Sequence, residues 1–217
     1  MKLIKTGIAG LDEFLLGGFT PGAYLILGSP ESGTEVFARQ IAYSRAKQTN
    51  ITYFTIAKVP EIVKEDMSTY GWETSKMEKE GKWKFIKPSA PSRSFIYNVT
   101  DEIRQNRCII IDSLSELLLT YSQEEMVEFL NSISTMNIEQ QELHLILMTK
   151  GMQNPIAEIT AQHFADGVIE LATSWETEVL ARSIMFKKMK GAIVPTRRLP
   201  YSIGKNGFTI ETAIRIT

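Results

Sequence analysis

The chain has 217 residues, of which 43% are apolar and 23% charged, a balance typical of a globular α/β protein with a sizeable core. Its formal net charge is −1, which excludes binding to a polyanion or an anionic membrane through overall charge. Its single cysteine, Cys108, excludes an internal disulfide, and no apolar run approaches the roughly 20 residues that span a bilayer. These features predict a cytoplasmic protein without a membrane partner, formed by one domain over 1–217.

Short aliphatic runs alternate with amphipathic segments, which is typical of β-α-β units on a largely parallel sheet flanked by helices. We expect strands at 23–28, 51–56, 82–87, 108–112, 143–148 and 167–171. The clearest helix follows Ser122, with Glu125 completing a capping box and an apolar stripe from Met126 to Met136 that belongs to the core. Beyond about Leu180, the pieces 180–190, 199–204 and 207–211 predict a C-terminal antiparallel extension of the sheet.

The segment GSPESGTE, residues 28–35, lies where a phosphate-binding loop of the pattern G-x-x-x-x-G-K-[ST] would lie. Gly28 and Gly33 have the required spacing between a strand and an amphipathic helix. Thr34, however, replaces the phosphate-binding lysine, and Glu35 replaces the hydroxyl that holds magnesium. Because one unit charge pair about 4 Å apart is worth about 4 kcal/mol at an effective dielectric near 20, both changes weaken triphosphate binding. We therefore expect no cofactor, with ATP and magnesium disfavoured, and no metal site.

A second element of the same site is the strand CIIID, which ends in Asp112. Carboxylates that orient magnesium stand at this position in phosphate-loop enzymes. Two interpretations stay open, because Asp112 also fits the N-cap of a helix formed by SLSELLL.

The opening KTGIAGLDEFLLGGFTPGAYLILGSPESG resembles that of KaiC-like and RadA-like members of the RecA superfamily. Further matches follow in the family's order: YGWETSKMEKEGKWKFI, CIIIDSLSEL, FADGVIEL and KKMKG. The resemblance covers essentially the whole chain and indicates an archaeal source. It implies a RecA-like P-loop NTPase fold and an ancestral ATPase function, in rings or filaments with nucleotide between subunits.

The resemblance also implies a water-orienting glutamate after the second strand, where this chain has Ala57 and Lys58. Neither side chain is a carboxylate base. Glu61 is a weak substitute, because an acidic residue after Pro60 suits the start of a helix. A further hypothesis is that Glu35 and Asp112 together hold a cation without nucleotide. The alternative is that Glu35 is simply a carboxylate at the N-terminus of a helix.

The one local excess of positive charge is formed by Lys187, Lys188, Lys190, Arg197 and Arg198. Lys190 takes the position of the family's arginine, which reaches toward a neighbouring subunit's phosphates, so it is a candidate interface residue. The alternative is a solvated basic edge that prevents strand-to-strand aggregation. A nucleic-acid partner has weak support, because the segments SLSELLLTYSQ and TKGMQNP carry a single lysine. His144 and His163 lack neighbours at metal-ligand spacing.

Three hypotheses for function follow. The first is a non-hydrolysing pseudo-ATPase that acts by protein association, with itself or with active paralogues, as an assembly or regulatory factor. The second is a weak or trans-complemented ATPase that uses a lysine such as Lys58. The third is a DNA-recombination accessory protein.

Overall fold

The computed structural model describes residues 2–88, 93–176 and 179–211. In chain order, the helices among these residues are α1 (Leu11–Phe14), the 3-10 turn η1 (Pro30–Ser32), α2 (Thr34–Arg45), α3 (Pro60–Ser68), α4 (Ser75–Lys79), α5 (Arg93–Arg104), α6 (Leu114–Leu117), α7 (Gln123–Gln140) and α8 (Pro155–Phe164). The strands are β1 (Gly22–Gly28), β2 (Asn50–Thr55), β3 (Trp83–Ile86), β4 (Arg107–Asp112), β5 (Leu143–Thr149), β6 (Gly167–Glu176), β7 (Val179–Met189), β8 (Leu199–Gly204) and β9 (Gly207–Ile210).

These strands form one sheet in the order β3-β2-β4-β5-β1-β6-β7-β8-β9. From β3 to β6 all neighbours are parallel, and from β6 to β9 they are antiparallel. The predicted α/β fold, with its parallel sheet and antiparallel C-terminal extension, is therefore confirmed. The register pairs Gly28 with Thr149 and Thr55 with Asp112, so the carboxyl ends of the central strands lie at one edge of the sheet.

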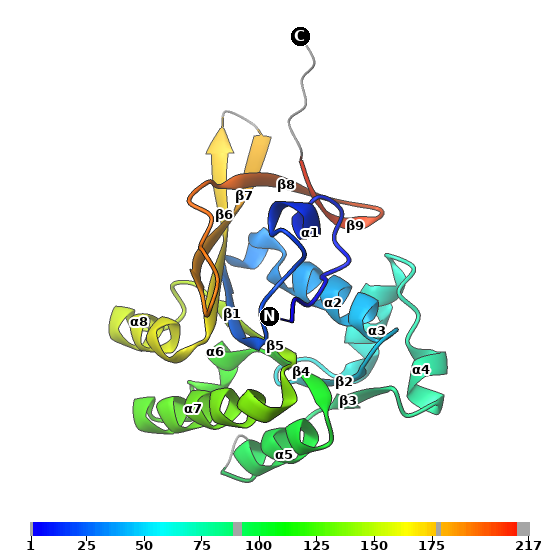
Figure 1. Cartoon of the computed structure of the whole chain (residues 1–217), viewed down its shortest axis with the longest axis vertical. Coiled ribbons are helices and arrows are strands. Elements are labelled where there is room, and N and C mark those ends of the chain that lie inside the picture. Colours follow the sequence, from blue (N-terminus) through cyan, green and yellow to red (C-terminus); the bar gives the residue numbers. More distant parts are fainter. Residues whose placement is uncertain (1, 89–92, 177–178, 212–217) are drawn as a thin grey trace.

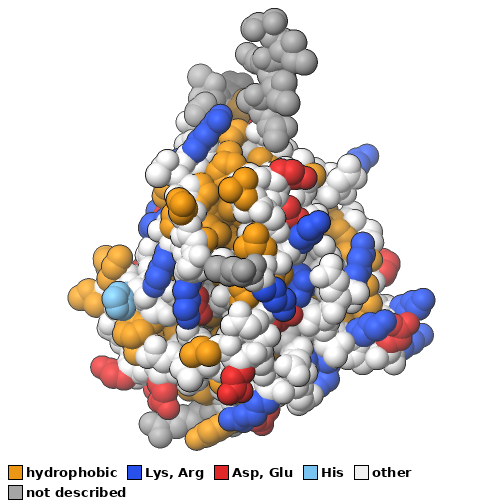
Figure 2. Space-filling model, viewed as in Figure 1, with side chains coloured by type: hydrophobic (Ala, Val, Ile, Leu, Met, Phe, Trp, Pro, Cys, Tyr) orange, Lys and Arg blue, Asp and Glu red, His pale blue; other side chains and the backbone are white. Residues whose placement is uncertain are grey.

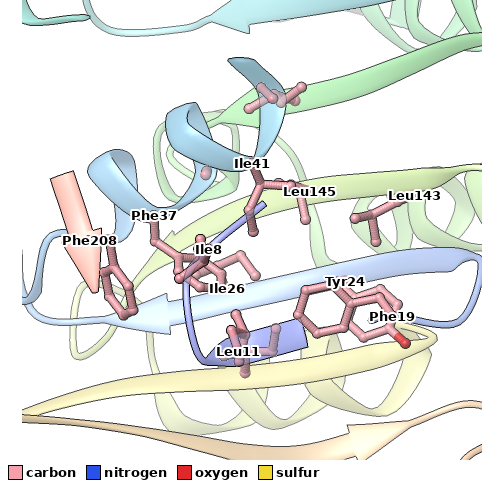
Figure 3. Packing of buried hydrophobic residues seen from close by; sticks show 14 of the residues in the cluster. Ile8, Leu11, Phe19, Tyr24, Ile26, Phe37, Ile41, Leu143, Leu145 and Phe208 are labelled. Carbon is pink, nitrogen blue, oxygen red and sulfur yellow. The ribbon is translucent and has the colours of Figure 1, made fainter. Parts of the chain in front are cut away.

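Helices cover both faces of the sheet (Figure 1). One core packs α1, α2 and α3 against the sheet, with Phe37 and Ile41 of α2 completely buried there. The other packs α5, α6, α7 and α8, with Phe129 and Ile133 of α7 completely buried. Figure 3 shows Ile26 of β1 and Leu145 of β5 facing α2. Because β1 and β5 have helices on both faces, their continuous apolar sequences are explained.

The antiparallel extension turns back over α2 (Figure 1). Strands β6 and β7 pair along their whole lengths, whereas β8 meets β7 at Ser183↔Pro200 and Ile184↔Leu199. The β8–β9 hairpin then lies on α2, where the ring centroids of Phe208 and Phe37 are 4.9 Å apart (Figure 3). The sequence predicted the strands of this extension but not its packing beside the phosphate loop.

Local details confirm some predictions and correct others. Ser122 is the N-cap of α7, with the predicted capping box to Glu125. The N-cap of α6, by contrast, is Ser113 with a capping box to Glu116, so the interpretation of Asp112 as a helix cap was wrong. Asp112 is instead the last residue of β4, one position too early for the cap. Strand β3 is shorter than predicted, because Lys82 and Lys87 lie outside it.

No helix within the described ranges is long and apolar enough to cross a membrane.

Candidate functional site

The phosphate loop connects the buried strand β1 to α2 through the single turn η1. An added Cβ on Gly28 would lie 2.2 Å from Ser32 Oγ and 3.0 Å from the carbonyl oxygen of Leu171. Gly33 has φ 78°, in the left-handed region that favours glycine. Both glycines are therefore required by the tight turn itself, whatever the loop binds.

The C-terminal hairpin lies directly against this loop. The hydroxyl of Tyr201 in β8 donates a 2.6 Å hydrogen bond to the carbonyl oxygen of Ser32, in a buried position. Burial raises the pKa of Tyr201, so its hydroxyl remains a neutral donor at physiological pH. The Cδ1 atom of Ile203 lies 2.2 Å from the point that a Cβ on Gly33 would occupy. Protein groups thus hold the backbone of the loop in place.

Glu31 places a carboxylate at the outer side of the loop. Its Oε1 accepts hydrogen bonds of 2.8 Å from the hydroxyls of Ser29 and Thr173. Its own backbone N–H is the largest cause of a lowered pKa, followed by those two hydroxyls. Glu31 is therefore ionised at neutral pH, and Pro30 beside it has no N–H to offer an anion.

Thr34 and Glu35 form the first turn of α2, and the position of Glu35 there is the predicted one. Thr34 is 8% exposed, and its hydroxyl donates to Glu35 Oε2 at 3.2 Å. Both residues line a pocket of about 70 Å³, together with Ala57, Lys58, Asp112, Ser113, Glu116, Leu147, Met148 and Thr149. The structure therefore brings Thr34, Glu35 and Asp112 together, as the sequence indicated.

Asp112 is bound from inside the protein. The side chain of Arg39, from α2, is 4% exposed and donates from Nη2 to Asp112 Oδ2 at 3.3 Å. The hydroxyl of Tyr53, from β2, donates to the same oxygen at 2.5 Å, and Arg39 Nε contacts the Tyr53 hydroxyl at 3.1 Å. The pKa of Tyr53 is raised well above its ordinary value, mainly by burial and in addition by the negative charge of Asp112, so Tyr53 stays neutral. Asp112 Oδ2 thus has two protein donors.

A second pocket, of about 390 Å³, lies beside the first. Lys58 lines both pockets, and its ammonium is 3.7 Å from Asp66, which also accepts from Arg39. Five acidic and three basic side chains line the two pockets, so their formal sum is −2: Glu31, Glu35, Asp66, Asp112 and Glu116 against Arg39, Lys58 and Arg182. Glu61 is exposed on the first turn of α3, as expected of a helix N-terminal carboxylate.

The predicted basic cluster is divided into two parts. Lys187 and Lys190 form ion pairs with Glu170 and Asp166 at 3.3 and 2.8 Å, and Lys188 donates to the carbonyl of His163. Arg197 and Arg198 are exposed on the segment between β7 and β8. On the face drawn in Figure 2, basic and acidic side chains are interspersed rather than gathered into one basic stripe.

His144 and Cys108 are core residues. Nδ1 of His144 accepts from the backbone N–H of Ile109 at 3.2 Å, and its Nε2 contacts Asn137 Oδ1 at 3.2 Å. Burial lowers the pKa of His144 to about 4, so the ring is neutral at pH 7. Across the part of the chain that the structure describes, no group of three or more His, Cys, Asp or Glu side chains is arranged to hold a metal ion.

Sequence reasoning missed Arg39, Tyr53 and Tyr201. Arg39 carried one signal, since it interrupts the apolar side of the helix after the phosphate loop, between Ala38 and Ile41. A charged residue on the buried side of a helix requires a partner. Nothing in the sequence identifies that partner as Asp112, because the two residues meet only when β4 lies beside α2.

A loop after β1, an aspartate at the end of β4 and the parallel strand order define a RecA-like P-loop NTPase fold. A family model described as "ATPase: KaiC" matches residues 4–214, and the chain belongs to this family. It is 26% identical to a UPF0273 protein of Thermotoga maritima, over 97% of this chain and 96% of that protein. It is also 26% identical, over 97% and 96% of the two chains, to UPF0273 protein MJ1359 of Methanocaldococcus jannaschii.

Among solved structures, the KaiC-like protein PH0186 from Pyrococcus horikoshii OT3 superposes with a TM-score of 0.84. The match covers 97% of this chain and 99% of that one, at 24% sequence identity. This similarity establishes the RecA-like fold that the sequence predicted.

Proposed function

We propose that this member of the KaiC ATPase family does not hydrolyse ATP and acts through protein association, as an assembly or regulatory factor. The observation that carries the proposal is the state of Asp112, whose Oδ2 is bound by Arg39 and Tyr53. A carboxylate that orients magnesium has to face the metal and its waters. Here the buried guanidinium of Arg39, in place of a magnesium ion, supplies the positive charge next to Asp112.

Electrostatics around the loop support the same proposal. The formal charge of the residues lining the two pockets is −2, and Glu31 and Glu35 belong to the loop whose backbone would have to bind a triphosphate. Phosphoryl transfer depends on neutralising the phosphate charges and positioning the attacking water. With Thr34 and Glu35 in the loop and Ala57 and Lys58 after β2, the residues present do not fit a magnesium–triphosphate complex.

The direct test measures radiolabelled ATP turnover and calorimetric nucleotide binding by the wild-type chain. We expect neither magnesium-dependent micromolar binding nor turnover, and observing both would overturn the proposal. The double variant Thr34→Lys with Glu35→Thr is expected to gain binding without turnover, because Asp112 remains bound to Arg39. A control with the same change of charge on an exposed segment is Thr120→Lys with Glu124→Thr, which is expected to gain nothing.

The association half of the proposal needs its own measurement. Light scattering during size-exclusion chromatography would reveal self-assembly, and mass spectrometry of co-purifying proteins from the native cell would reveal related ATPases. We expect a complex with a second copy or with such a relative. A chain that is monomeric at all concentrations and co-purifies with neither would contradict this half.

A weak or trans-complemented ATPase is the second candidate, and one observation favours it. Lys58 lines both pockets, and its side chain is 46% exposed, so its ammonium has room to move toward a phosphate. If the wild-type chain turns over ATP, this candidate expects Lys58→Met to abolish the activity. Lys64→Met is the matched control, because Lys64 is a lysine of α3 with a similar exposure of 36% that pairs with Glu78. Equal activity in the two variants would remove Lys58 from consideration.

A further inference from the structure

The β8–β9 hairpin contacts the phosphate loop and α2, in addition to its pairing within the sheet. The β7–β8 register holds it to the rest of the sheet at two residue pairs. Its own strands pair at four positions, from Tyr201↔Ile210 to Gly204↔Gly207. Further attachments run to the loop and to the helix that follows it, and the ring of Trp72 lies next to Gly207.

Two of these attachments fix the loop. Tyr201 donates its buried hydrogen bond to the carbonyl of Ser32, the residue before the left-handed Gly33. Ile203 fills the space next to Gly33 that a side chain there would need. Losing the Tyr201 contact would leave a buried carbonyl unpaired, which is costly because water cannot replace the donor.

The other attachments fix the hairpin to α2. The side-chain amide of Gln40 donates to the backbone carbonyl of Phe208 at 3.1 Å and accepts from its backbone N–H at 2.6 Å. The Phe208 ring packs edge-on against Phe37, with a centroid distance of 4.9 Å (Figure 3). It also stacks on the ring of Tyr201, with a centroid distance of 4.2 Å. Phe208 therefore links the helix to the same tyrosine that holds the loop.

We propose that the β8–β9 hairpin, the phosphate loop and the start of α2 form one cooperative unit, which opens and closes together and gives the loop its shape without a nucleotide. Native proteins open locally in roughly contiguous cooperative units, which often coincide with supersecondary motifs such as a hairpin and the segments packed on it. The inference does not depend on whether the chain hydrolyses ATP.

Gln40→Ala is the most informative variant, because Gln40 contacts the hairpin and none of its hydrogen bonds reaches the loop. Amide hydrogen exchange of the full chain, followed by mass spectrometry without nucleotide, would report peptides covering 29–36, 107–112 and 199–210. We expect exchange about tenfold faster in the first and last peptides, by the same factor, and no change in 107–112. Tyr201→Phe is expected to give the same pattern from the other end of the unit.

Two controls exclude a general loss of stability. Gln48→Ala removes a side chain that accepts a 3.0 Å hydrogen bond from Arg45, at the far end of α2. Tyr24→Phe removes a buried hydroxyl that bonds to Thr20 at 2.7 Å, away from the loop. Neither is expected to accelerate 29–36. Faster exchange of the hairpin alone in Gln40→Ala would overturn the proposal, as would equal acceleration of all three peptides.

Discussion

The ion pair between Arg39 and Asp112 gives the sharpest quantitative prediction. Their charged atoms are 3.3 Å apart, and the two side chains are 4% and 15% exposed. At an effective dielectric of about 20, a separation of this size corresponds to about 5 kcal/mol of direct attraction, before the cost of removing both groups from water. Removing one partner of a buried pair costs roughly 3–5 kcal/mol, because the other charge remains buried. Since Asp112 keeps some exposure and the Tyr53 hydrogen bond, we expect Arg39→Met to lower the free energy of unfolding by about 3 kcal/mol, near the lower limit.

A double-mutant cycle separates the pair from its surroundings. Urea unfolding of Arg39→Met, Asp112→Asn and the double variant is followed by tryptophan fluorescence, to which the buried Trp72 and Trp83 contribute. The coupling energy is expected to be about 2 kcal/mol, within the range for residues in direct contact. Lys76 and Glu80, an exposed i,i+4 pair 4.0 Å apart with 89% and 39% exposure, form the control, with an expected coupling below about 0.5 kcal/mol. Equal coupling in the two cycles would refute the view that Arg39 neutralises Asp112.

Two further predictions concern stability. The folded-state pKa of His144, about 4, lies below its unfolded value of 6.5, so the unfolded chain binds more protons between these values. The free energy of unfolding should therefore fall by up to about 3 kcal/mol as pH drops from 6.5 to 4. Urea unfolding at several pH values should show that the free energy of unfolding falls less on acidification in His144→Gln than in the control His163→Gln, which changes an exposed residue. Equal decreases in the two variants would contradict a lowered pKa of His144. The second prediction concerns the glycine at the start of the loop. Gly28→Ala should lower the melting temperature, because overpacking costs about 1–3 kcal/mol. The control Gly204→Ala should change the melting temperature little, since no atom lies within 4 Å of the added Cβ, and similar shifts in the two variants would show that the loop accommodates a side chain.

Much of the fold could be predicted from the sequence because it depends on local patterns. Continuous aliphatic runs marked the central strands, and Ser122 with Glu125 marked the start of α7. The grouping of Thr34, Glu35 and Asp112 followed from parallel strands whose carboxyl ends share one edge. Such arguments need only neighbouring residues and the topology.

The interior of the site could not be predicted in the same way. The contact of Arg39 with Asp112 spans 73 positions in sequence, and that of Tyr201 with Ser32 spans 169. Each depends on side-chain direction after the sheet has formed. The alternative N-cap role of Asp112 was wrong for a related reason, because a shift of one residue between strand and helix decides whether Asp112 or Ser113 caps α6.

The position of Arg39 also limits which amino-acid substitutions near Asp112 a chain of this kind can accept during evolution. A variant that frees Asp112 by losing Arg39 first forfeits about 3 kcal/mol of stability, a large share of the 5–15 kcal/mol that an ordinary protein has in total. A variant that gains a lysine and a hydroxyl in the loop first still has its aspartate bound to Arg39 and Tyr53. Under the proposed function, neither order of single substitutions restores a magnesium site at the first step, so the ion pair of Arg39 with Asp112 opposes a return to ATP hydrolysis.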